Sequence, residues 1–122
     1  MKITGNVFVV TGAGNGMGRE VTLQLLRKGA RVAGVDLSEA GLAETKALAG
    51  QASGRLSTHV LSVADRAAVE ALPDAVIAEH GRVDGVLNIA GIIQRFVHVD
   101  DLAVEEIEKI MAVNFWGTLY VT

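Results

Sequence analysis

The sequence of 122 residues contains no cysteine and only one proline. Without cysteine the chain has no disulfide framework, no cysteine nucleophile and no thiolate-bound zinc. Its apolar runs are a few residues long, far short of the roughly 20 residues that span a bilayer. The first residues also lack the long apolar stretch of a secretory signal. We therefore expect a cytoplasmic protein with no membrane partner.

An excess of positive charge is also missing. Eleven Lys and Arg residues face 14 Asp and Glu residues, for a net charge of −3, which argues against attraction to nucleic acid or anionic lipid. Repeats, low-complexity segments and linkers are absent, so the length fits one domain. Glycine is abundant instead: its 14 residues are about 11% of the chain against a usual ~7%. The backbone must bend sharply or approach something closely at many positions.

Short apolar runs alternate with helical patterns along the chain. The strand-like runs are 7–10, 31–35, 56–63 and 83–89, and the helical patterns occupy 17–28, 38–50, 65–81 and 104–122. The connections are too long for hairpins, so this β-α-β-α-β-α-β-α order requires parallel strands with right-handed crossovers. It predicts an α/β fold, a doubly wound parallel sheet of Rossmann type in three α/β/α layers. Pro73 lies inside the third helical pattern and should kink or split it.

A glycine-rich turn follows the first strand directly. It reads Thr11-Gly12-Ala13-Gly14-Asn15-Gly16-Met17-Gly18 and opens a helix. Such a turn binds phosphate, because free N–H groups and the helix dipole face the anion and missing Cβ atoms let it approach. A P-loop is excluded because no glycine precedes a lysine. The strict G-x-G-x-x-G pattern fails at Met17, and the spacing that fits is T-G-x-x-x-G-x-G.

This turn and three later positions resemble the short-chain dehydrogenase/reductase family, in the same order along the chain. Asp36 ends the second strand about 20 residues after the turn, where the acidic residue of the family holds the adenosine ribose hydroxyls. Asn88-Ile89-Ala90-Gly91 is similar to the N-N-A-G motif of the family. Asn114 resembles the asparagine of the catalytic helix, which helps to hold a proton-relay water. The alternatives are a strand-end aspartate at position 36 and a helix-face amide at position 114.

The resemblance covers the whole chain but only the first half of a family member. It implies that residues 1–122 are the N-terminal portion of an NAD(P)-binding Rossmann domain. The activity it implies is hydride transfer between an alcohol or carbonyl substrate and the nicotinamide. The implied site has a catalytic Asn114, no metal, and cofactor contacts at Gly12, Asn15, Gly16, Met17, Gly18, Asp36, Leu37, Ser62, Val63, Asn88, Ala90, Gly91 and Val113.

The sequence departs from the family pattern at several positions. Ser62-Val63 stands where the family usually has Asp-Val, which alters the side-chain contact to adenine, and Ile89 replaces the second asparagine of the motif. The catalytic serine and Tyr-x-x-x-Lys of the family follow the helix with which the chain stops. Tyr120 is the only tyrosine and no lysine follows it. We expect the 122 residues alone to bind NAD weakly at best, to transfer no hydride, and to be oligomeric, marginally stable or part of a longer chain.

Asp36 predicts the choice of cofactor. A carboxylate within about 4 Å of a 2′-phosphate meets a like charge, whereas it accepts hydrogen bonds from the ribose hydroxyls of NAD. No lysine or arginine is expected to offset this charge, since Asn15 is neutral and Leu37 follows. We therefore predict NAD over NADP, by at least about tenfold in affinity.

The partners implied by the resemblance are a small alcohol or ketone and further copies of the chain. The family commonly pairs subunits through the last helix, so Phe115, Trp116 and Tyr120 are predicted to lie in the core or at a dimer or tetramer interface. The alternative function is a non-catalytic nucleotide-binding or assembly module made of this half alone. A flavodoxin-like or receiver domain is disfavoured, because the acidic cluster or Ser/Thr-rich loop it needs after the first strand is missing.

The remaining polar residues suggest structural roles. His59, His80 and His98 are scattered with no ligand spacing, so we expect them to be structural or on the surface. Asp100 and Asp101 precede the last helix and are interpreted as capping and solvated charge.

Overall fold

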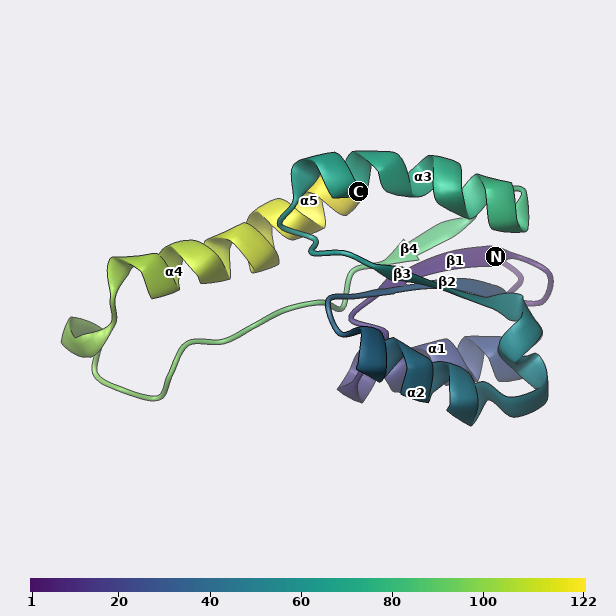
Figure 1. Ribbon diagram of the computed structural model, residues 1–122, viewed down its shortest axis with the longest axis horizontal. Helices are drawn as coiled ribbons and strands as arrows, with labels where there is room; N and C mark the ends of the chain where they lie inside the picture. The colour runs from purple at the N-terminus through teal and green to yellow at the C-terminus, as the bar shows by residue number, and fades with distance from the viewer.

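The computed structural model describes residues 1–122 and contains one four-stranded parallel sheet, in the order β3-β2-β1-β4. Its strands are β1 (Val7–Thr11), β2 (Arg31–Asp36), β3 (Leu56–Val60) and β4 (Gly85–Leu87). The helices are α1 (Gly16–Arg27), α2 (Glu39–Ala49), η1 (Gly50–Arg55), α3 (Arg66–His80), η2 (Val99–Asp101), α4 (Val104–Met111), η3 (Ala112–Gly117) and α5 (Thr118–Val121). Helices α1 and α2 lie on one side of the sheet, and α3 and α5 on the other (Figure 1). The predicted Rossmann-type fold with three layers is confirmed.

The alternation of side chains along the strands divides the core into two parts. Phe8 and Val10 of β1 pack in one cluster, whereas Val7 and Val9 pack in another on the opposite face. The first cluster also contains Leu25, Leu26, Val32, Leu42 and Leu56, and the second contains Ala33, Val35, Leu72 and Val76. Full burial of each large side chain is worth roughly 1.5–3 kcal/mol. Strand β1, buried along its whole length, therefore anchors both layers of helices.

The carboxyl ends of β1 and β2 meet at one edge of the sheet. The parallel register pairs Thr11 with Val35, so the glycine-rich turn and Asp36 leave the sheet side by side. Both strands thus deliver polar groups to the same place, which is where parallel α/β sheets bind ligands.

Strands β3 and β4 are shorter than the predicted runs 56–63 and 83–89. After Val60, the Leu61 N–H still donates to the Asp36 carbonyl, but the chain then turns, with the Asp65 N–H bonded to the Ser62 carbonyl at 3.0 Å. Beyond Leu87, two backbone N–H groups bond to a side chain of β1 instead of to its backbone. A turn therefore ends β3, and bonding to the Thr11 hydroxyl ends β4.

Helix α3 differs from expectation at two positions. Of the two effects expected of Pro73, a kink or a split, the split does not occur, because α3 runs unbroken through the proline. Proline removes one backbone hydrogen bond, and burial of Val69, Leu72 and Val76 against the sheet holds the helix together. The helical pattern of the sequence also predicts that Ile77 points inward with these residues, whereas 49% of Ile77 is exposed.

The last predicted helix, from 104 onward, is one continuous helical run whose middle part is a π-helical turn. Elements α4, η3 and α5 follow one another without a break. The buried Gly117 sits so close to the segment before α3 that a Cβ there would lie 2.6 Å from the Val63 side chain. Phe115 and Trp116 are about half exposed, so they are not core residues of this chain. None of the helices is long and apolar enough to cross a membrane.

The start of this run also differs from expectation. The N-cap of α4 is Ala103, which offers no side-chain hydrogen bond. Asp100 and Asp101 lie in the preceding η2 turn, where both are exposed. The prediction that they cap the helix is wrong, and their charge is solvated.

Candidate functional site

The glycine-rich turn is bound to the end of β4 through Thr11. Its buried hydroxyl accepts hydrogen bonds from the Ile89 N–H at 3.0 Å and the Ala90 N–H at 3.1 Å. Gly12 has a φ of +74°, and a Cβ there would lie 3.0 Å from the Ala90 nitrogen. Any side chain at position 12 would therefore be strained and would push β4 away from the turn.

The N-terminus of α1 packs against the turn yet leaves open space in front of it. A Cβ on Gly18 would lie 1.9 Å from the Gly12 carbonyl oxygen, whereas one on Gly16 would meet nothing within 4 Å. The Asn15 side chain caps the helix by accepting the Gly16 N–H at 2.7 Å. Met17 is exposed. Arg19 is the first residue whose backbone N–H donates a helical hydrogen bond, to the Asn15 carbonyl. The cap occupies the Gly16 N–H, whereas the next N–H groups of this first turn, those of Met17 and Gly18, can face an anion.

Asp36 ties the end of β2 to the same turn. One of its carboxylate oxygens accepts the Gly14 N–H at 2.9 Å, and the other accepts the Ser38 N–H at 2.9 Å. Gly14 is needed for this approach, because a Cβ there would lie 2.9 Å from the Asp36 carboxyl carbon. The carboxylate thus holds the turn while keeping further lone pairs for a ligand.

The carbonyl side of the turn is held by two residues that the sequence reasoning missed. The Arg19 guanidinium donates to the Gly14 carbonyl at 2.6 Å, to Thr45 Oγ1 at 3.0 Å and to a Glu44 carboxylate oxygen at 2.9 Å. The buried Thr45 hydroxyl donates to the Ala13 carbonyl at 2.8 Å. Because these carbonyls are drawn toward α2, the N–H groups of the turn face the other way. The local pattern in the sequence held no signal for either contact.

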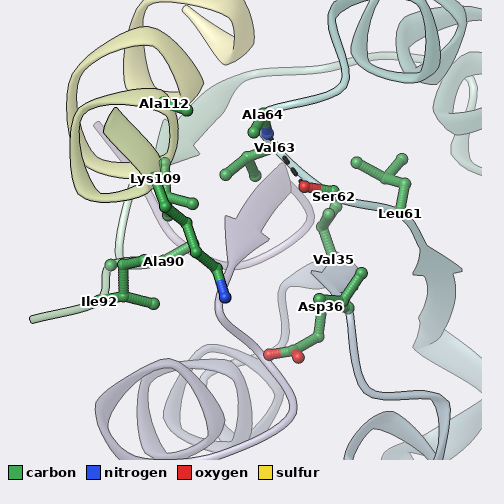
Figure 2. A pocket seen from close by; sticks show the side chains of 13 residues that line it. Val35, Asp36, Leu61, Ser62, Val63, Ala64, Ala90, Ile92, Lys109 and Ala112 are labelled. Carbon is green, nitrogen blue, oxygen red and sulfur yellow. Dashed lines mark hydrogen bonds between the residues drawn. The ribbon is translucent and has the colours of Figure 1, made fainter. Parts of the chain in front are cut away.

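Beside the turn lies a pocket of about 350 Å³ between the ends of β2 and β3, the segment after β4, and α4 (Figure 2). It is lined by Val35, Asp36, Leu37, Leu61, Ser62, Val63, Ala64, Ala90, Gly91, Ile92, Lys109, Ala112 and Val113. The predicted cofactor residues from Asp36 to Val113 meet here, except for Asn88. The Ser62 hydroxyl accepts the Ala64 N–H at 3.2 Å, as the dashed line in Figure 2 shows. The lining is mostly apolar with few polar groups, as in a small-molecule site.

The other two asparagines of the predicted site, Asn88 and Asn114, bond to residues outside the glycine-rich turn. The Asn88 side chain donates to Thr122 Oγ1 at 3.1 Å, so it is not part of the pocket. Asn114 lies in the π-helical turn, and its amide both accepts the Ile92 N–H at 2.9 Å and donates to the Ile92 carbonyl at 2.7 Å. It therefore fixes the segment that leaves β4. Turns of π-helix inside α-helices are frequent at functional sites.

Lys109 is the one pocket residue that places a cation there, and sequence reasoning missed it. It lies one helical turn before Val113, so helical spacing puts both on one face of the run. Figure 2 shows its side chain extending from α4 into the pocket, its nitrogen turned toward the side where the Asp36 carboxylate lies. The expectation that no lysine or arginine offsets the charge of Asp36 is therefore wrong, because Lys109 lines the same pocket.

The chain matches known proteins over almost its whole length. The profile of the family described as short chain dehydrogenase matches residues 6–122. D-threitol dehydrogenase of Mycolicibacterium smegmatis is 38% identical over 120 residues, covering 96% of this chain and 45% of that protein. The chain spans less than half the length of the curated relatives it matches.

Two solved structures are similar in fold. 3-ketoacyl-(acyl-carrier-protein) reductase from Brucella melitensis, complexed with NADH, gives a TM-score of 0.91 at 29% identity, covering 98% of this chain and 48% of that chain. A metagenomic short-chain oxidoreductase in complex with NADP gives a TM-score of 0.89 at 27% identity, covering 99% of this chain and 55% of that chain.

Proposed function

The chain belongs to the short-chain dehydrogenase family, and we propose that it is the cofactor-binding part of an NAD-dependent oxidoreductase. The protein would interconvert an alcohol and a carbonyl compound, with the nicotinamide carrying the hydride. The single observation that carries the proposal is the position of Asp36. Its carboxylate ends β2, touches the glycine-rich turn and lines the pocket.

The proposed cofactor would lie across the turn and the pocket. Its pyrophosphate would accept hydrogen bonds from the first-turn N–H groups of α1, beside Gly16 and Met17, where the space in front of Gly16 is open and the helix dipole favours an anion. Its adenine would enter the apolar pocket between Leu37, Val63 and Val113. Ser62 would face it through a hydroxyl instead of a carboxylate.

Asp36 supports NAD as the cofactor. Its oxygens each use one lone pair on a backbone N–H group, so both retain acceptor capacity for the two hydroxyls of an adenosine ribose. A 2′-phosphate in the same place would meet the carboxylate at about 4 Å. The repulsion per pair of unit charges would be about 1 kcal/mol in water and about 4 kcal/mol at the dielectric response near a protein surface.

We propose a catalytic role for Asn114 as the resemblance implies, through a water that relays a proton. Each side-chain atom uses one hydrogen-bonding position on Ile92, which leaves one lone pair and one N–H for that water. The substrate is proposed to be a small alcohol or ketone. The polyol named by the relative D-threitol dehydrogenase is consistent with this class.

The test is a titration of the full protein with NADH and NADPH, followed by nicotinamide fluorescence. We expect NADH to bind at least about tenfold more tightly. Asp36→Ala should reduce this ratio, because it removes both the ribose acceptor and the repulsion. Asp74→Ala, which removes an exposed carboxylate of α3, is the matched control and should leave the ratio unchanged. Equal dissociation constants in the unaltered protein would contradict the proposal.

A further inference from the structure

The pocket beside the glycine-rich turn holds two charged side chains of opposite sign, Asp36 and Lys109. Asp36 is engaged by two backbone N–H groups, whereas the Lys109 side chain takes part in none of the five ion pairs of the structure. Of the three glutamates of α4, Glu106 is paired with Arg95 at 3.0 Å, and neither Glu105 nor Glu108 forms an ion pair with Lys109. Lys109 therefore brings to the pocket a positive charge that forms no ion pair in the structure.

The rest of the lining gives this charge no other partner. Position 62 carries a serine whose hydroxyl is bonded to the Ala64 N–H, and the remaining lining residues apart from Asp36 are uncharged. Lys109 is exposed, and its side chain reaches inward along the pocket wall (Figure 2). An ammonium on a flexible four-carbon stem can follow an anion over several ångströms, because it acts as a compact point charge.

We propose that Lys109 is a specificity-determining residue of the adenosine site. Its ammonium pairs with the 2′-phosphate of the ribose and so reduces the preference for NAD over NADP that Asp36 sets. This inference rests on the proposed function, since it assumes that the pocket takes an adenosine. Asp36 repels a 2′-phosphate and Lys109 attracts it from the opposite wall. The balance of the two, instead of Asp36 alone, decides how strongly the protein discriminates between the cofactors.

The ligands for the test are adenosine 5′-monophosphate and adenosine 2′,5′-bisphosphate, which differ by the 2′-phosphate alone. Their dissociation constants are measured by calorimetry on the full protein, unaltered and carrying Lys109→Met, which keeps the length of the side chain without its charge. We expect this substitution to weaken binding of the bisphosphate about three- to fivefold, as for the loss of one exposed charge pair, and to change the affinity for the monophosphate less than about twofold.

Two variants separate charge in the pocket from charge elsewhere. Lys109→Arg should keep bisphosphate binding within about twofold, because it retains the charge. Lys46 is an exposed lysine of α2. Lys46→Met removes the same net charge outside the pocket and should leave the dissociation constants of both nucleotides unchanged. The effect of Lys109→Met should also shrink in about 0.5 M salt, because exposed charge pairs are screened.

The outcomes distinguish this inference from the proposed function. If the unaltered protein binds neither nucleotide, the adenosine site itself is wrong and the inference fails with it. If both nucleotides bind and Lys109→Met leaves the ratio of their dissociation constants unchanged, the adenosine site stands and the role of Lys109 is overturned. If Lys46→Met weakens binding of the bisphosphate as much as Lys109→Met does, the effect comes from the net charge of the protein, which also overturns the role of Lys109.

Discussion

At the scale of single residues, the turn depends on glycines for two different physical reasons. Gly12 and Gly16 have positive φ, which costs a side chain backbone strain. Gly14 and Gly18 have ordinary φ but lie against Asp36 and against the Gly12 carbonyl, so a side chain there meets atoms. Gly12 combines both requirements, since a Cβ there would also lie 3.0 Å from the Ala90 nitrogen.

We predict that Gly18→Ala destabilises the protein by about 1–3 kcal/mol, the cost of forcing an extra group into a packed site. A Cβ would overlap the Gly12 carbonyl oxygen at 1.9 Å, and α1 would have to move away from the turn. The measurement is chemical denaturation of both proteins, together with nucleotide titration, in which affinity should fall as well.

The matched control is Gly54→Ala. Gly54 lies in η1 without a positive φ, and a Cβ at this position would meet nothing within 4 Å, so stability should change by less than about 0.5 kcal/mol. Equal stability of the Gly18 and Gly54 variants would show that α1 does not pack on the turn as described.

At the scale of elements, a serine and two histidines connect β3 to the end of α3. Ser57 Oγ lies 2.8 Å from His59 Nε2 and 2.8 Å from His80 Nε2. One hydroxyl can donate to one neutral imidazole and accept from the other. The two histidines are 21 positions apart in the sequence and show no common role there. Their structural role becomes visible only in the fold, where the edge strand β3 contacts the end of α3.

The pKa values of both histidines are lowered, mainly because burial disfavours the charged imidazolium. The positive charge of His80 adds to this for His59, and Arg31 adds to it for His80, whereas Glu79 opposes it in both cases. Since the folded pKa lies below the ordinary value of about 6.5, the unfolded chain takes up protons first as the pH falls. Stability is therefore complete above this value and decreases below it.

We predict that the free energy of unfolding decreases as the pH falls below about 6.5, and that replacing both histidines with glutamine flattens this decrease. Urea denaturation at several pH values measures it. His98→Gln, a change at an exposed histidine, is the control and should leave the slope as it is. If the double variant keeps the slope of the unaltered protein, protonation of this cluster does not control stability.

At the scale of the whole molecule, the two faces of the sheet are covered unequally. Helices α1 and α2 bury a cluster of nine residues on one face, and the other face has a smaller cluster of six. The run formed by α4, η3 and α5 leaves Met111, Phe115, Trp116 and Leu119 about half exposed. Apolar surface of this kind commonly marks an interaction site.

We predict that this run forms the interface of a homo-oligomer, so that Phe115→Glu combined with Leu119→Glu lowers the molar mass measured by light scattering. A buried unpaired carboxylate costs more than the contacts that an interface provides. Leu48→Glu changes an equally exposed leucine on α2 and should leave the mass unaltered. An unaltered protein that is already monomeric at micromolar concentration would contradict the prediction.

The sequence by itself determined the fold class and the place of the turn, because both depend on local properties. Strand and helix periodicity set the β-α order, and glycine spacing marked the turn between β1 and α1. Asp36 could be placed because a residue at the end of a parallel strand lies at the binding edge. Element ends were less predictable, since a turn at Ser62 and a hydroxyl at Thr11 ended β3 and β4.

Only the tertiary structure decided which distant side chains meet. It brought Lys109 into the pocket with Asp36, Thr45 to the Ala13 carbonyl, and His80 to Ser57. It also turned Asn88 toward Thr122, outside the pocket. Such contacts depend on how far each helix extends and how it packs on the sheet, and short-range sequence patterns carry no information about distances between elements.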